Sequence, residues 1–92
     1  MPAPVTTSVD TADGSVTTGP GRVWGILVAA GATGGAWQLN DSTDDSGTDL
    51  ISGVAPANSG YFIDLSTIPV EFATAIYADI PGTNVTLTTF YT

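Results

Sequence analysis

The chain has 92 residues, no cysteine and no histidine, and one basic residue against nine acidic ones, which gives a formal charge of −8. A single cationic side chain cannot neutralise nucleic-acid phosphates or an anionic membrane surface, so both are excluded as partners. Without Cys, His or Lys the chain also lacks the usual nucleophiles and general bases, and we expect no enzymatic activity and no cofactor.

Short apolar runs alternate with clusters of Gly, Pro, Asn, Asp and Ser along the whole chain. A spacing of roughly 8–12 residues between such turn signals is typical of β-sandwiches and barrels. We therefore predict an all-β fold, a single antiparallel β-sandwich of jelly-roll type with seven or eight short strands over residues 1–92. Pro2 and Pro4 disfavour a helix, so residues 1–9 are predicted to form either an edge strand or an extended N-terminal arm.

The segment RVWGILVAA, residues 22–30, is the strongest predicted strand. Its side chains divide into two apolar sets that point in opposite directions, Val23, Leu27 and Ala29 on one side and Trp24, Ile26, Val28 and Ala30 on the other. A strand that is apolar on both sides is covered on both faces. In a two-layer sandwich the second face must then be covered by another chain or by a loop, which suggests an oligomer.

The remaining apolar segments are shorter, and most alternate between an apolar and a more polar side. They are predicted as strands within residues 36–40, 48–53 and 61–66, followed by a closing hairpin over residues 67–92. Pro81–Gly82 fits the centre of a type II turn, which places the turn of that hairpin.

An acidic stretch, LNDSTDDSGTDL at residues 39–50, holds four of the nine acidic residues. Clustered carboxylates bind Ca²⁺, so these residues form a weak candidate calcium site: Asp41, Asp44, Asp45 and Asp49. No register of the stretch matches the ligand spacing of an EF-hand loop. The alternative, which the spacing favours, is a solvated hairpin connection in which Asp and Ser bond their own backbone and Ser46–Gly47 forms the turn.

Five aromatic residues could form a flat surface on which sugar rings stack: Trp24, Trp37, Tyr61, Tyr77 and Tyr91. Most of them lie at alternating strand positions, where packing in a core or an interface is the simpler interpretation. Arg22, the only cation, is either a solubilising charge at a strand edge or a bidentate partner of a carboxylate in the same or a neighbouring chain.

Several features between about residue 20 and residue 92 are shared with a known group of proteins. They are an apolar strand ending in a small-residue turn (Val23 to Gly31), a W-x-L-x-D strand (Trp37, Leu39, Asp41), an S-G-T step (46–48), and an F-x-x-x-x-Y strand (Phe72, Tyr77) that pairs with a last strand ending in Tyr91. In these features the chain resembles small β-sandwich virion proteins of tailed bacteriophages. That group includes capsid decoration (cement) proteins and head or tail knob proteins; Ala75 stands where they usually have Gly.

The resemblance implies a non-enzymatic virion protein, often trimeric, that binds the major capsid protein on the outside of the head and stabilises the head. Such a protein is assembled in the host cytoplasm, and because MPAPVTTSVD has no signal-peptide pattern we expect no secretion.

A thin core without disulfides separately favours oligomerisation. Together with the resemblance, which implies a trimer, it leads us to expect a homotrimer. The arm 1–9 is expected to reach a neighbouring subunit. Candidate residues for the oligomer or capsid interface are Val5, Arg22, Trp24, Ile26, Val28 and Phe90. The alternative function is a receptor- or carbohydrate-binding tip of a phage tail fibre or adhesin.

Overall fold

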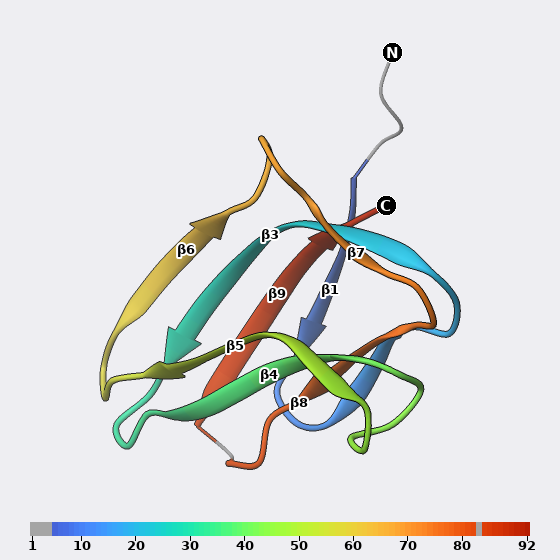
Figure 1. Cartoon of the computed structure of the whole chain (residues 1–92). Coiled ribbons are helices and arrows are strands. Elements are labelled where there is room, and N and C mark those ends of the chain that lie inside the picture. The colour runs from blue at the N-terminus through green and yellow to red at the C-terminus, as the bar shows by residue number, and fades with distance from the viewer. Residues whose placement is uncertain (1–4, 83) are drawn as a thin grey trace.

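A computed structural model describes residues 5–82 and 84–92, and these residues fold into two antiparallel sheets packed together (Figure 1). The nine strands are β1 (Thr6–Asp10), β2 (Gly14–Thr17), β3 (Gly21–Ala30), β4 (Gly35–Asp41), β5 (Thr48–Ala55), β6 (Gly60–Asp64), β7 (Val70–Phe72), β8 (Ile76–Asp79) and β9 (Val85–Tyr91). The predicted all-β sandwich is confirmed, with nine strands in place of seven or eight. Nothing in the described part of the chain is a helix long and apolar enough to cross a membrane.

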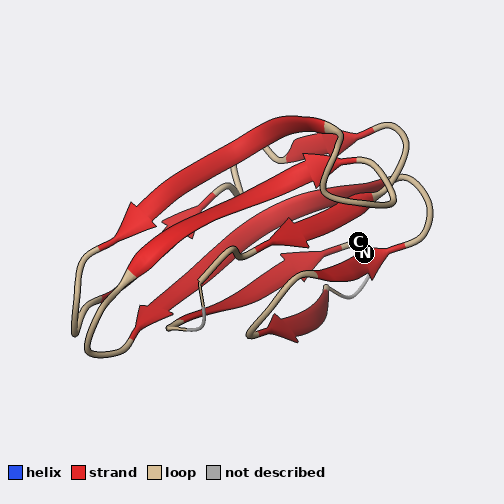
Figure 2. Cartoon of the chain, turned by 90° about the horizontal axis from the view of Figure 1, so that it is seen from below, coloured by secondary structure: helices blue, strands red, loops and turns tan. Residues whose placement is uncertain are grey.

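The strand order in both sheets follows jelly-roll connectivity. The five-stranded sheet has the order β1-β9-β3-β6, with the short β7 also paired to β3, and the four-stranded sheet has the order β2-β8-β4-β5. When β7 is left out, the first, last, third and sixth strands form one sheet, and the second, seventh, fourth and fifth form the other. This is the double-sheet arrangement of a jelly roll. Turned by 90°, the long strands lie along a similar axis and point in alternating directions, with loops at their ends (Figure 2).

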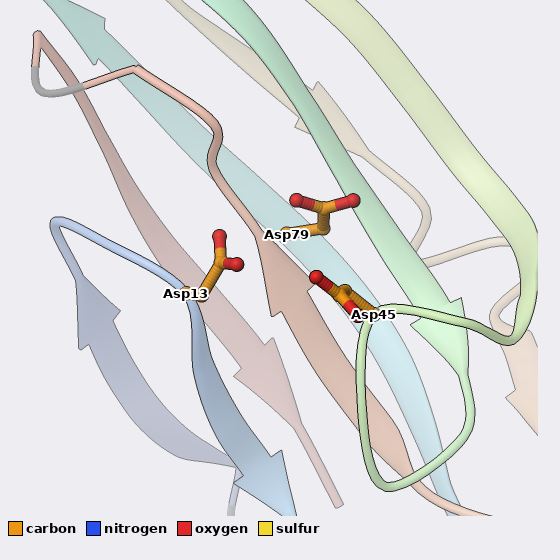
Figure 3. A group of neighbouring side chains, drawn as sticks. All are labelled: Asp13, Asp45 and Asp79. Carbon is orange, nitrogen blue, oxygen red and sulfur yellow. The ribbon is translucent and has the colours of Figure 1, made fainter.

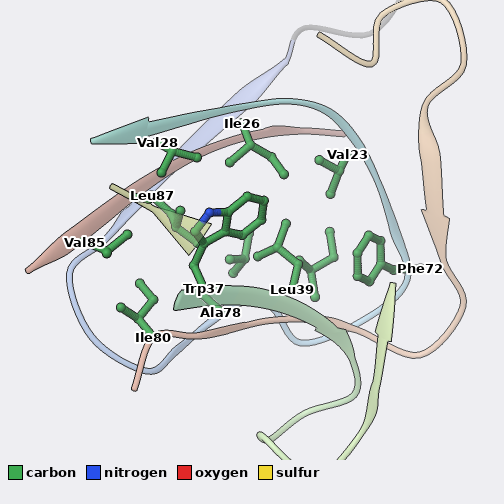
Figure 4. Packing of buried hydrophobic residues seen from close by; sticks show 13 residues of the cluster. Val23, Ile26, Val28, Trp37, Leu39, Phe72, Ala78, Ile80, Val85 and Leu87 are labelled. Atoms are coloured by element: carbon green, nitrogen blue, oxygen red, sulfur yellow. The ribbon is translucent and has the colours of Figure 1, made fainter. Parts of the chain in front are cut away.

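The core lies between the sheets and is built around Trp37, which has no exposed surface (Figure 4). The Trp37 Nε1–H donates to the hydroxyl of Tyr61 over 2.9 Å, which satisfies the one polar atom of the ring. A Cβ atom at Gly53, on the neighbouring strand, would lie 2.8 Å from Trp37 Cζ2, so the indole occupies the space that a side chain there would need. Around it pack the buried residues Val23, Ile26, Val28, Leu39, Phe72, Ala78, Ile80, Val85 and Leu87.

A β-bulge in β3 corrects the predicted division of that strand. The register between β3 and β9 shifts between Val23 and Gly25, so one extra residue is inserted there. Val23 therefore faces inward together with Ile26 and Val28, and all three are fully buried, whereas Leu27 faces outward and is 43% exposed. The prediction of Ile26 and Val28 as interface residues is wrong, because both side chains are enclosed between the sheets of their own chain.

The N-terminal segment is an edge strand where the structure describes it. Thr6–Asp10 pairs in antiparallel register with β9, from Thr6 opposite Tyr91 to Asp10 opposite Leu87. Of the predicted arm, residues 6–9 are thus held in the five-stranded sheet, and residues 1–4 lie outside the described residues. Val5, which precedes β1, is 47% exposed.

Thr89 leads to a first prediction, because its side chain is fully buried and its Oγ1 has no hydrogen-bond partner. A buried hydroxyl without a partner destabilises a fold by about 1–3 kcal/mol. We predict that Thr89→Val, which replaces the hydroxyl by a methyl group, raises the free energy of unfolding in urea by about 1–2 kcal/mol. Thr88→Val, at a partly exposed position of the same strand, is the control and should have little effect. A Thr89→Val protein less stable than the wild type would contradict the prediction.

Candidate functional site

The outer face of the five-stranded sheet carries an apolar surface. Strand alternation and register place Val9, Leu27, Phe62 and Phe90 on this face, with Thr88 between Val9 and Leu27, and we call these four residues the apolar face. Val9 is 64%, Phe62 53% and Leu27 43% exposed, while Phe90 is half-buried. Hydrophobic side chains that lie together on a surface mark an interaction site more often than single ones do.

A glycine shapes the centre of the apolar face. The rings of Phe62 and Phe90 meet edge to face, with centroids 5.8 Å apart and planes at 78°. Gly25 lies between them in the sheet, and a Cβ atom there would come within 2.7 Å of Phe62 Cζ. Because Gly25 has no side chain, the Phe62 ring can lie across β3 toward Phe90. The result is a positioned aromatic pair at the surface.

The outer face of the four-stranded sheet is acidic instead. Carboxylates of Asp13, Asp45 and Asp79 each offer one oxygen, and these three oxygens lie within 4.8 Å of one another (Figure 3). Asp13 precedes β2, Asp45 lies in the loop between β4 and β5, and Asp79 ends β8. We call these three residues the acidic cluster.

Like charges act on one another within the acidic cluster. Partial burial, followed by the charges of Asp13 and Asp45, raises the pKa of Asp79 above its ordinary value. Burial and the same two charges also raise the pKa of the neighbouring Tyr77. With its amide nitrogen turned toward the carboxylates, Gln38 donates to Asp79 Oδ2 over 3.0 Å and to Asp49. The face is therefore strongly negative, and the Gln38 amide borders the acidic cluster.

Asp41, the first aspartate of the acidic stretch, has a structural role. Its carboxylate accepts hydrogen bonds from three consecutive backbone N–H groups, those of Ala73, Thr74 and Ala75, at 3.3, 2.8 and 3.3 Å. The bond from Thr74, followed by those from Ala75 and Ala73, lowers the pKa of Asp41. Asp41 thereby ties the end of β4 to the connection between β7 and β8.

The other three aspartates of the acidic stretch also have different partners from one another. Asp44 Oδ1 accepts bonds from the backbone N–H and the hydroxyl of Ser46, at 2.9 and 2.6 Å, which is the turn chemistry predicted for this loop. Asp49 lies beside Gln38, and only Asp45 joins the acidic cluster. The predicted set of four ligands is therefore not brought together, and its place is taken by a group containing Asp13 and Asp79. In the sequence Asp13 stands before Gly14 and Asp79 at the end of an alternating segment, and neither pattern links the two residues to each other.

Two further interface candidates, Arg22 and Trp24, bond within their own chain. Arg22 pairs with Glu71 of its own chain, with both Nε and Nη2 at 2.9 Å from Oε1, and both side chains are more than half exposed. This is a surface ion pair of small energetic value. Trp24 is half-buried, and its Nε1–H donates to Thr92 Oγ1 over 2.8 Å.

The five aromatics proposed as a sugar platform do not share one surface. Trp37 is fully buried, and Tyr61 and Tyr91 pack against the core. Tyr77 lies on the outer face of the four-stranded sheet, beside the acidic cluster. The aromatic pair at the surface is instead Phe62, which is exposed, and Phe90, which is half-buried. Only Phe90 was among the interface candidates, because the sequence does not reveal which strands lie next to each other.

Comparisons with protein-family models, with curated proteins and with solved structures found no match to this chain. The two outer faces, one apolar and one acidic, are the features of the molecule that bear on its function.

The role of Asp41 gives a second prediction. Asp41→Ala removes the acceptor of three backbone N–H groups and should lower the melting temperature by several degrees, while Asp41→Asn, which keeps one oxygen, should lower it less. Circular dichroism during heating measures the effect. Asp44→Asn, a change in the same stretch at a residue that bonds only within its own turn, is the control. Equal melting temperatures for Asp41→Ala and Asp44→Asn would contradict this role.

Proposed function

We propose that this protein is a non-enzymatic structural protein of a virion, which associates with copies of itself and decorates the outside of a phage capsid. The observation that carries the proposal is the apolar face. Its members Leu27, Phe62 and Phe90 lie on three adjacent strands, and Leu27 and Phe62 are 43% and 53% exposed. A second copy of the chain is the proposed occupant, in a homotrimer.

The distribution of charge supports self-association through this face. Each chain carries a formal charge of −8, so two copies repel each other unless their acidic groups are kept apart. Asp13, Asp45, Asp49 and Asp79 lie on the side of the other sheet. The outward positions around Phe62 are Val, Leu, Phe, Thr and Gly, and one carboxylate, that of Asp64 opposite Gly25, lies among them. Contact through the apolar face buries hydrophobic area and leaves most carboxylates in water.

Attachment to the capsid then follows from symmetry and charge. A trimer presents three copies of its acidic face, which would fit basic patches on several subunits of the major capsid protein. Three weak contacts made at once give much stronger binding than one contact does. The arrangement needs no catalytic site, and stabilisation of the head would come from linking neighbouring capsid subunits.

The apolar face gives the third prediction. In sedimentation at micromolar concentration, the wild-type protein should run as a species near three times the 9.3 kDa of one chain. Phe62→Asp places a charge at the centre of the face and should weaken association by about tenfold or more, since central aromatic residues contribute most to interfaces. Circular dichroism confirms that the variant is folded.

The matched control is Val54→Asp, which adds the same charge at a 70% exposed valine on the other sheet and should leave association intact. A monomeric wild type, or equal association of the two variants, would contradict the proposed self-association.

Capsid binding is tested separately by co-sedimentation with empty heads of the source phage, where the wild-type protein should pellet with the shells. The alternative, a receptor- or carbohydrate-binding tip, predicts quenching of tryptophan fluorescence by a member of a glycan panel and no binding to shells. That outcome would overturn the capsid assignment.

A further inference from the structure

The acidic cluster has a geometry that a bound cation would explain. Its three carboxylates come from segments far apart in the sequence, and their nearest oxygens are within 4.8 Å of one another. Oxygens that share one Ca²⁺ each lie 2.3–2.6 Å from the ion, so they are about 3–5 Å from one another. The only arginine of the chain pairs with Glu71, so no cationic side chain among the described residues balances the cluster.

Asn40 provides a second and independent observation. Its side chain is fully buried, and neither Oδ1 nor Nδ2 has a hydrogen-bond partner. A buried amide without partners is costly, and most such groups in folded proteins are satisfied by protein, water or an ion.

Strand register places Asn40 diagonally next to Asp79, on the same face of the sheet as the cluster. Asn40 pairs with Tyr77 on β8 and with Asp49 on β5, and two residues earlier Gln38 pairs with Asp79. Alternation therefore puts Asn40 on the outer face of the sheet, the face from which Asp79 projects. The diagonal separation between such positions is about 7–8 Å, which side chains pointing to a common centre can span. Asn40 is next to the last residue of β4, and the loop that carries Asp45 starts directly after this strand.

We infer that Asp13, Asp45, Asp79 and Asn40 hold a divalent cation of the Ca²⁺ type. Three carboxylates and an amide oxygen are hard ligands, which Ca²⁺ prefers, and the chain has no Cys or His to favour a softer metal. Two of the carboxylates come from a turn and a loop, and such flexible ligands suit the variable coordination of Ca²⁺ better than the strict octahedron of Mg²⁺. The remaining positions are open to water.

The cation would cross-link three segments of the chain. It joins the turn before β2, the loop between β4 and β5, and the end of β8. Because the site is assembled only in the folded chain, binding stabilises the fold in proportion to the logarithm of the free cation concentration once that exceeds the dissociation constant.

The test is calorimetric titration of chelator-treated protein with CaCl₂, together with melting curves at constant ionic strength. We expect saturable binding of one Ca²⁺ per chain and a melting temperature that rises with CaCl₂ and returns with chelator. MgCl₂ at the same concentration should produce a smaller rise.

Variants locate the site. Asp79→Asn should weaken Ca²⁺ binding by about tenfold or more, because ligand charge sets affinity, and Asn40→Ala should weaken it as well. Without Ca²⁺, Asp79→Asn should melt at a higher temperature than the wild type, since it removes one of three repelling charges. Asp64→Asn, the same change on the other sheet, is the control and should keep full affinity.

Absence of saturable binding to the wild-type protein would overturn the inference. Equal Ca²⁺ affinities of Asp79→Asn and Asp64→Asn would also overturn it. The effect of Ca²⁺ on the protein would then come from general screening of an acidic surface. Binding retained by folded Asn40→Ala but lost by Asp79→Asn would remove Asn40 from the ligand set.

Discussion

The indole of Trp37 joins the two sheets, and the position of both outer faces depends on it. The ring comes from β4 of the four-stranded sheet, fills the interior, and donates its N–H to Tyr61 on β6 of the five-stranded sheet. Tyr61 in turn donates to the carbonyl of Val54 on β5. Tyr61 thus forms hydrogen bonds with two strands of the four-stranded sheet. A domain of this size has only a thin core. One large side chain that contacts both sheets therefore fixes their separation, and Gly53 leaves the space in which it fits.

The fold class could be predicted from the sequence because strand alternation and turn residues are local signals. Trp37 and Leu39 were assigned to one side of their strand, and both are core residues. The error in β3 has a physical reason: a bulge is a property of two paired strands, and its effect on the phase of alternation appears only with the partner β9 in place. That the strand is apolar on both sides was correct. Its outer apolar side is Leu27 and its neighbours, and the inner side includes Ile26 and Val28.

The acidic stretch shows why proximity in sequence is a poor guide to a carboxylate site. Its aspartates point to different partners: Asp41 to backbone N–H groups after β7, Asp44 to its own turn, and Asp45 to the cluster. The other two members of the cluster come from the pairing of β2 with β8, in which Gly14 lies opposite Ala78 and so sets Asp13 beside Asp79. Only the strand order brings these residues together. The turn interpretation holds for Asp44, whose turn with Ser46 is present in the structure. The predicted calcium site of four aspartates is not assembled, and a cation remains an inference for a different set of carboxylates.

The two outer faces impose different requirements that do not compete, because they belong to opposite sheets. Association through the apolar face would gather several chains of charge −8 in one particle, and their mutual repulsion grows with every chain added. A divalent cation at the acidic cluster would remove part of that charge from each chain, at a site away from the contact between chains. Ca²⁺ should therefore favour assembly without touching the interface, through a long-range effect that salt screens beyond about 10 Å. An acidic loop held by a cation would also present its remaining carboxylates in a fixed arrangement, which a basic partner surface recognises at a lower entropic cost than a mobile loop.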